Sequence, residues 1–319
     1  MTVFDRKLPH TDFDQLQNCA EQLPWFRDLL LRWQPAGDAL VGSADKATKH
    51  LRLAIRDGYL NFYRLGQSVA KVGFSQAGVP EAKIHNKYVD DGVGDQSYVL
   101  LKGGRLYSAK GEDLGRYTGP DQLDGWIEEA EEYSGREKCF VDEVVARNAN
   151  VIDLEMGLPA TGDVKTAPRM DLVALEEAAN GWRIVFWEAK LMGDGRLRRS
   201  GDLVPEVVAQ LNAYTRWMAH PGNTERVAKA YHEACRLFVR FHSLAQSVGA
   251  APAQLGRGII AVATAATPPE VDMQPRLIIE DRVPNATWEA NGHHAKLTSH
   301  SVAMHIVRED AGLTLPVAA

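Results

Sequence analysis

The sequence predicts a mixed α/β protein, of the α+β kind with a mixed sheet, and two observations lead to this prediction. In the first 120 residues, short apolar runs separated by glycines and polar residues follow a helical stretch, which is typical of consecutive strands. In the rest of the chain, helical and strand patterns alternate, which indicates a mixed α/β core. We therefore expect a small α+β module over residues 1–120 and a larger domain over residues 121–319.

The first module begins with apolar residues at helical spacing between residues 12 and 33, which Pro24 should divide into two short helices. Six strand-like segments follow, at residues 51–58, 59–66, 67–75, 83–89, 97–104 and 105–109. Their aromatic and basic mixture, such as Tyr59, Phe62, Tyr63 and Arg64, can hold nucleic acid, but aromatic residues in short strands are usually core. We expect this module to select substrate or to mediate self-association into a homo-oligomer.

The second domain begins with a helix over residues 121–133, whose run of glutamates is expected to face solvent. Further helices are predicted near residues 140–148, 204–218 and 226–246. Strands are predicted at residues 151–155, 170–176 and 182–190, with buried strands at residues 258–266 and 276–281. The pattern beyond residue 285 is ambiguous.

Composition limits the classes of function. With 319 residues and 45% apolar residues, the chain can bury a large core. Its net charge of -6 means that any contact with nucleic acid must come from a local basic patch. The widely spaced Cys19, Cys139 and Cys235 predict neither a disulfide framework nor a zinc site. Because no signal peptide and no apolar stretch of about 18 residues is present, we expect a cytoplasmic protein with no membrane partner.

The segment that indicates chemistry is a predicted β-hairpin, formed by the strands around residues 170–176 and 182–190. Side chains two apart in a strand share a face, so Glu188 and Lys190 should project together while Trp187 and Ala189 point to the other side. Pairing with the preceding strand can bring Asp171 opposite them. The second strand is apolar on both faces and is therefore expected to be buried, where charges are costly unless they are paired or functional.

This residue set suits hydrolysis of a phosphodiester. Asp171, Glu188 and the backbone carbonyl of Ala189 offer oxygen ligands for Mg²⁺, and Lys190 can orient or deprotonate the attacking water. A bare Asp/Glu-x-Lys tripeptide is a weak signal, because it also begins at Asp5, Glu81 and Asp163. Only the tripeptide at Glu188 closes an apolar strand-like run. The alternative is an ordinary surface ion pair worth about 0–1 kcal/mol.

From about residue 140 to 218 the chain resembles the PD-(D/E)XK nuclease superfamily. The resemblance implies a restriction-endonuclease-like nuclease core, built as a mixed sheet with flanking helices. It also implies Mg²⁺-dependent cleavage of DNA, with Mn²⁺ as a substitute, and duplex DNA is expected over single strands. Here Pro168 is separated from Asp171 by two residues, whereas family members often have the proline directly before the aspartate.

Two further residues are implied by the same resemblance. A glutamate on the helix before the first core strand corresponds to Glu143, with Glu155 as the rival position. A glutamine on the helix after the lysine strand corresponds to Gln210, for which a buried structural amide is nearly as good an explanation. Nucleases of this kind usually act in bacterial defence or DNA repair.

Basic residues around the hairpin suit contacts to phosphates. Arg196, Arg198 and Arg199 lie in a glycine-containing loop directly after the lysine strand, and Arg169 precedes Asp171 by two residues. A solvated loop explains the three loop arginines equally well. Two other functions remain open: a catalytically silent module that binds nucleic acid on a nuclease-like fold, and an RNA-processing nuclease.

Overall fold

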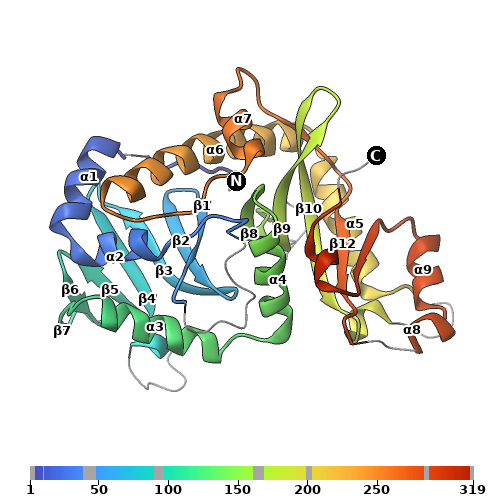
Figure 1. Cartoon of the computed structure of the whole chain (residues 1–319), viewed down its shortest axis with the longest axis horizontal. Helices are drawn as coiled ribbons and strands as arrows, with labels where there is room; N and C mark the ends of the chain where they lie inside the picture. Colours follow the sequence, from blue (N-terminus) through green and yellow to red (C-terminus); the bar gives the residue numbers. More distant parts are fainter. Residues whose placement is uncertain are drawn as a thin grey trace.

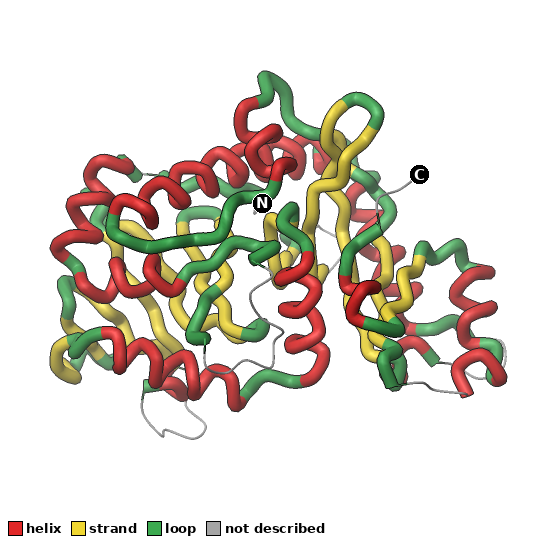
Figure 2. The backbone as a smooth tube through the Cα atoms, viewed as in Figure 1, coloured by secondary structure: helices red, strands yellow, loops and turns green. Residues whose placement is uncertain are grey.

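The computed structural model describes residues 4–9, 11–38, 48–89, 97–160, 169–198, 203–283 and 287–316. Within these ranges the chain forms two β-sheets surrounded by helices (Figure 1), which confirms the mixed α/β class. Figure 2 shows the two sheets beside each other, with helices around and between them. In the described part of the chain, every helix is too short or too polar to cross a membrane.

Two short helices open the described chain, as predicted. They are α1 (Phe13–Gln22) and α2 (Pro24–Arg32). Asp12 caps α1 by accepting a hydrogen bond from the backbone N–H of Asp14, and Pro24 takes the first position of α2, where no N–H donor is needed. Both helices pack in the same core as α6 (Asn223–Ser247), with the rings of Phe13 and Phe241 4.9 Å apart.

The first sheet is a seven-stranded antiparallel meander. Its strands, in order, are β1 (Arg52–Arg56), β2 (Tyr59–Arg64), β3 (Gln67–Phe74), β4 (Pro80–His85), β5 (Tyr98–Lys102), β6 (Arg105–Tyr107) and β7 (Asp113–Arg116). The prediction missed β7 because only Leu114 in it is apolar. Alternate residues such as Leu60, Phe62 and Val72 are buried in a core with α3 (Pro120–Glu132). That core covers one face of the sheet.

The second sheet is mixed. Strands β8 (Val151–Gly157), β9 (Arg169–Ala178) and β10 (Gly181–Leu191) are antiparallel neighbours. Strand β12 (Arg276–Glu280) lies parallel to β10, β13 (Met304–Val307) lies parallel to β12, and the short β11 (Glu270–Val271) also pairs with β10. The predicted hairpin is therefore present, with Gly181 at φ +126° closing its turn. Strand β10 is central, as its two apolar faces required.

Helices cover both faces of this sheet. Helix α4 (Arg136–Arg147) packs on one face, and α5 (Glu206–Met218), α6 and α7 (Arg257–Thr264) pack on the other. The prediction of a strand at residues 258–266 is wrong, because this segment forms α7. Ile259 and Val262, three residues apart, are buried at helical spacing, and Gly258 lies so close to Trp182 that an added Cβ would be 2.7 Å from its ring.

The region after residue 283, for which no structure was predicted, forms short elements: α8 (Thr287–Ala290), α9 (His293–Ser299), β13 and η3 (Asp310–Leu313). Two other single-turn helices are η1 (Asn86–Tyr88) and η2 (Gly195–Leu197). The three cysteines form no disulfide in the described structure, as expected.

The predicted boundary near residue 120 separates the two sheets, but one hydrophobic cluster runs through both halves. A buried ion network also joins them. Asp153 of β8 accepts hydrogen bonds from Arg6 (2.9 Å), from Arg56 of β1 and from the hydroxyl of Tyr231 (2.8 Å). Burial alone would raise the Asp153 pKa, but Arg56 and Arg6 hold it below its ordinary value. The two halves are therefore joined by core packing and by compensated charges.

Candidate active site

Asp171, Glu188 and Lys190 converge at the ends of β9 and β10. The backbone N–H of Ala189 donates to Asp171 Oδ2 at 2.9 Å, and Lys190 Nζ lies 4.0 Å from the same oxygen. Lys190 Nζ also pairs with Glu188 Oε1 and donates to the carbonyl of Ala189 at 2.6 Å. The three side chains are buried, and Lys190 is only 1% exposed. The structure thus brings together the three residues that the hairpin pattern selected.

The alternation of β10 explains why these charges share one side. Val185, Trp187 and Ala189 belong to the hydrophobic cluster that includes α4, whereas Ile184 and Phe186 belong to the cluster on the opposite face. Glu188 and Lys190 have the same parity as Ile184 and Phe186, so they continue that second face beyond its apolar part. At the end of the strand, Lys190 Nζ lies 3.6 Å from Glu137 Oε2 in the first turn of α4.

A second lysine, Lys138 in the first turn of α4, also enters the cluster. Its ammonium donates to Asp171 Oδ1 at 3.1 Å and pairs with Glu155 of β8. Burial would lower the Lys138 pKa, but the carboxylates of Asp171 and Glu155 raise it above its ordinary value. The turn between β2 and β3 packs against this lysine, because a Cβ on Gly66 would lie 2.7 Å from Lys138 Cδ. The first sheet therefore helps to position Lys138.

Glu155 itself has strained backbone geometry, with φ +50° in the left-handed region that favours glycine. Such a conformation costs about 1–3 kcal/mol in a non-glycine residue and occurs often at functional sites. The irregular backbone places the carboxylate beside Lys138 and Asp171. Of the two candidates for the upstream glutamate, the structure brings Glu155 to the cluster.

Glu143, the preferred candidate, lies elsewhere. It forms an ion pair with Arg282 at 2.5 Å, away from the cluster at the start of α4. Instead, Glu137 from the first turn of α4 approaches the site, with Oε2 3.6 Å from Lys190 Nζ and 3.3 Å from Arg196 Nη2. Glu143 lies six positions after Glu137, so it is about 9 Å further along the helix axis and on another side of the helix.

The sequence reasoning missed Glu137 and Lys138 because it began the helix near residue 140, whereas α4 begins at Arg136. Helix ends are the least certain part of a prediction from sequence pattern. Charged residues in a first helical turn are also common on solvated surfaces, so no signal distinguished this pair. Only their packing against β8, β9 and β10 identifies them.

Glu188 has an unusual electrostatic environment. Burial is the main cause that raises its pKa to about 7, the nearby Asp171 carboxylate raises it further, and Lys190 and Gln210 act in the opposite direction. Gln210 of α5 also donates from Nε2 to the backbone carbonyl of Arg169 at 3.5 Å. Gln210 therefore lies at the cluster, as expected. Burial is also the main cause of the raised pKa of Glu137; burial and the Asp171 carboxylate together outweigh the ammonium of Lys190, which lowers it.

The arginines that were expected to contact phosphates differ in their surroundings. Arg169 is exposed at the start of β9. Arg196 is held by Asp194 at 2.5 Å and by Glu137. Arg198 donates to the carbonyl of Met192 at 2.9 Å and stands over the ring of Trp288, so its contacts are within the protein. Arg199 and Pro168 lie outside the described residues.

The oxygen atoms at this site are of the kinds that bind a hard divalent cation. Asp171 and Glu188 supply carboxylate oxygens and Ala189 a carbonyl oxygen, the donors that Mg²⁺ prefers. The raised Glu188 pKa indicates that burial and the second carboxylate disfavour its charge, and a bound cation would offset both effects. In the described part of the chain, no group of three or more His, Cys, Asp or Glu side chains is arranged as a metal site. A cation at these oxygens would compete with the ammonium groups of Lys138 and Lys190.

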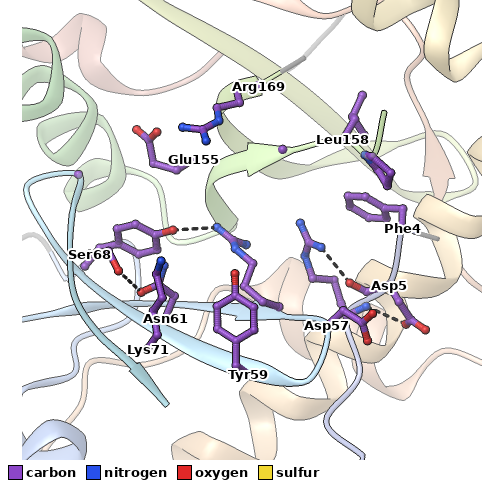
Figure 3. Close-up of a pocket in the computed structure, with 16 residues that line it drawn as sticks. Phe4, Asp5, Asp57, Tyr59, Asn61, Ser68, Lys71, Glu155, Leu158 and Arg169 are labelled. Atoms are coloured by element: carbon purple, nitrogen blue, oxygen red, sulfur yellow. Dashed lines mark hydrogen bonds between the residues drawn. The ribbon is translucent and has the colours of Figure 1, made fainter. Parts of the chain in front are cut away.

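Next to the cluster lies a cavity of about 550 Å³ between the first sheet and the ends of β8 and β9 (Figure 3). Glu155 and Arg169 line one side, and Tyr59, Asn61 and Lys71 line the other. The cavity reaches the cluster through Glu155, whereas Asp171, Glu188 and Lys190 are buried and are not among the residues that line it. Comparison with family models, with curated proteins and with solved structures gives no match for this chain.

Proposed function

We propose that this protein is a divalent-metal-dependent nuclease that hydrolyses DNA phosphodiester bonds. The observation that supports it most is the convergence of Asp171, Glu188 and Lys190 at the ends of two adjoining strands. A mixed sheet with helices on both faces also agrees with what the PD-(D/E)XK resemblance implies. Bacterial defence or DNA repair is the setting that we propose for it.

Burial distinguishes this cluster from an ordinary ion pair. Lys190 is 1% exposed and Glu188 is 3% exposed, whereas surface pairs are solvated and contribute little. Taking charges out of water costs several kcal/mol per ion, and the attraction between them seldom recovers more than that cost. A cluster of buried charges that gains little stability is typical of a site retained for function.

Each residue has a role in the proposed reaction. Asp171 and Glu188, with the carbonyl of Ala189, would hold Mg²⁺ or Mn²⁺, and the N–H of Ala189 fixes the orientation of Asp171. The bound cation would polarise the scissile phosphate and acidify an attacking water. As an ammonium, Lys190 would provide positive charge for the phosphate and orient the water; as a neutral amine it would instead accept a proton from the water. Glu137 and Gln210 are positioning residues, through Lys190 and Glu188 respectively.

The test is cleavage of circular and linear plasmid DNA by the purified protein, with Mg²⁺, with Mn²⁺ or with EDTA. We expect cleavage only with metal, and loss of cleavage in Lys190→Ala with DNA binding retained. Lys229→Ala is the matched control, because it removes an exposed lysine on α6. Equal cleavage rates for Lys190→Ala and the parent would contradict the assignment. Disappearance of the circular substrate would indicate endonuclease action.

One observation favours a second candidate, a module that binds DNA without turnover. Each of the carboxylates of Glu155, Asp171 and Glu188 already pairs with an ammonium group, that of Lys138 or Lys190, without a bound cation. Calorimetric titration with Mn²⁺ separates the two candidates, because a silent module would bind DNA without binding metal. Parallel digestion of labelled DNA and RNA tests the choice of DNA over an RNA substrate.

A further inference from the structure

The first sheet has one face that the core does not cover. Residues paired across neighbouring strands share a face, and the pairs Asn61–Lys71, Lys71–Lys83 and Lys83–Leu100 form a continuous row over β2 to β5. Leu100 pairs in turn with Tyr107 of β6. The residues between them in each strand, including Leu60, Val72 and Leu101, are buried on the opposite face. The row therefore lies on the face opposite that core, which we call the outer face; on it Asn61 is buried, whereas Lys71, Lys83 and Leu100 are partly or fully exposed.

Two hollows adjoin along this row. The first is the cavity of about 550 Å³ next to the candidate active site, with Tyr59, Tyr63 and Lys71 in its wall. The second, of about 590 Å³, is lined by Lys83, Ser97, Tyr98, Leu100, Lys102, Tyr107, Ser108, Ala109 and Gly111. Lys71 connects the two, because its Nζ donates to the hydroxyl of Tyr98 at 3.1 Å and lies 4.9 Å from the centre of that ring.

Charge on this face differs from that of the whole chain. The protein carries a net charge of -6, yet the described residues that line the second hollow include Lys83 and Lys102 and no acid. Glu81 pairs with Lys102 at its edge, at 2.9 Å. Lys71 adds a further positive charge between the hollows. The first hollow is lined by both signs of charge, with Asp5, Asp57 and Glu155 beside Arg6, Arg56 and Arg169. The basic strip is therefore formed by Lys71 and the second hollow, where it can attract a polyanion.

Aromatic rings alternate with these lysines. Tyr59 in the first hollow and Tyr98 and Tyr107 in the second are partly exposed, whereas Tyr63 in the first hollow is buried. Rings beside a basic groove are the means by which proteins hold single-stranded nucleic acid, since each base can stack and each phosphate can meet a lysine. From β2 to β6 the row crosses four strand spacings, about 19 Å, which accommodates a few nucleotides.

The row ends at the candidate active site. Figure 3 shows Tyr59 and Asn61 rising from the sheet toward Glu155 and Arg169 across the first hollow. Glu155 pairs with Lys138, which in turn contacts Asp171. A strand of DNA lying on the row would therefore approach the cluster from the side of Arg169.

We propose that the outer face of the first sheet binds a single-stranded DNA segment and leads it to the cluster of Asp171, Glu188 and Lys190. The last part of this statement rests on the proposed nuclease function. The preferred substrate is then a single strand or a duplex with a single-stranded tail, and a blunt duplex is bound less tightly. The first module thus supplies substrate selection.

The experiment measures binding by fluorescence anisotropy in EDTA, with no turnover, using the full-length protein. The labelled probes are a blunt duplex, the same duplex with a ten-nucleotide DNA tail, and the same duplex with an RNA tail. We expect the DNA tail to increase affinity by about tenfold or more. The variant Lys71→Ala/Lys83→Ala should lower affinity for the tailed probe and reduce the slope of log K against log salt by about 1.4, at about 0.7 per phosphate contact.

Controls separate binding from folding. Lys229→Ala removes an exposed lysine on α6 and should leave the salt slope within error of the parent. Lys71 is partly buried, so its substitution can also affect folding. The second variant is therefore Lys83→Glu. Lys83 is exposed, and its substitution should leave the thermal unfolding curve unchanged. Tyr98→Ala should weaken tail binding about 5- to 100-fold through the loss of one stacking ring.

Two results would overturn the inference: equal affinity for tailed and blunt duplexes, or variants of the row that weaken both probes no more than Lys229→Ala does. Preference for the RNA tail over the DNA tail would overturn the choice of DNA. Tail binding as expected, with no cleavage in Mg²⁺, supports the binding surface and contradicts only the nuclease. Cleavage without any tail preference contradicts only the surface.

Discussion

The titration of Glu188 gives the sharpest test of the electrostatics at the candidate site. Burial and the neighbouring Asp171 raise the pKa of Glu188 from its ordinary value of 4.5 to about 7 in the folded protein. The folded protein therefore binds a proton on Glu188 more tightly than the unfolded chain does. As the pH rises from about 4.5, the unfolded chain ionises first, so the free energy of unfolding falls until the pH exceeds about 7.

The size of this effect follows from the two pKa values. They differ by about 2.5, and each pH unit corresponds to 1.36 kcal/mol, so Glu188 should lower the free energy of unfolding by about 3 kcal/mol between pH 4.5 and 7.5. The glutamine of Glu188→Gln cannot titrate, so the variant's free energy of unfolding should lack this pH-dependent decrease. Titrating groups far from Glu188 behave alike in both proteins, so they cancel in the difference between the two curves.

The assay is urea unfolding of the parent and of Glu188→Gln in EDTA, at pH 4.5, 5.5, 6.5 and 7.5. The variant should gain stability relative to the parent by about 3 kcal/mol over this range. A difference in the free energy of unfolding that is the same at every pH reflects the changed partner of Lys190, and only the change of this difference with pH reports the titration. A difference that stays constant within about 0.5 kcal/mol at all four pH values would refute the reasoning, because Glu188 would then titrate alike in both states.

Three further predictions concern the neighbours of this residue and the connection between the two sheets. Lys138→Ala removes the ammonium that bridges Asp171 and Glu155, so Mn²⁺ should bind more tightly by calorimetry while the protein without metal melts at a lower temperature; weaker metal binding would contradict this. Glu137→Gln should change the cleavage rate, because Glu137 contacts Lys190, while Glu143→Gln should cleave at the rate of the parent. A changed rate in Glu143→Gln with an unchanged rate in Glu137→Gln would favour Glu143 as the positioning residue. Asp153→Asn leaves two buried guanidinium groups without their carboxylate, so it should lower the free energy of unfolding in urea by about 3–5 kcal/mol. A decrease below about 1 kcal/mol would show that the network contributes little to stability.

The site was predictable as far as local periodicity reaches. The alternation of strand residues placed Glu188 and Lys190 on one side, and the short turn before Gly181 brought Asp171 opposite them. Both statements concern residues that are close in sequence, where the period of two and the hairpin geometry leave few alternatives. The same holds for the division of the first helical stretch at Pro24.

Local pattern failed where an apolar run was short or where packing made the choice. Residues 258–266 are apolar throughout and β-branched in part, so their pattern suits a buried strand as well as a buried helix. The close approach of Gly258 to Trp182 and of Gly256 to Ala149 belongs to the helix that forms. Neither contact can be read from the segment itself, because each partner lies far away in the sequence.

By itself, the sequence determined which residue types stand together on one hairpin and that the hairpin is central in a mixed sheet. Only the tertiary structure decided which charges from other elements surround it: Glu137 and Lys138 from α4, and Glu155 of β8 in place of Glu143. The same is true of the hollow that joins the first sheet to the site. The physical reason is that a strand or hairpin fixes the directions of its own side chains, whereas contacts between distant segments depend on how whole elements pack.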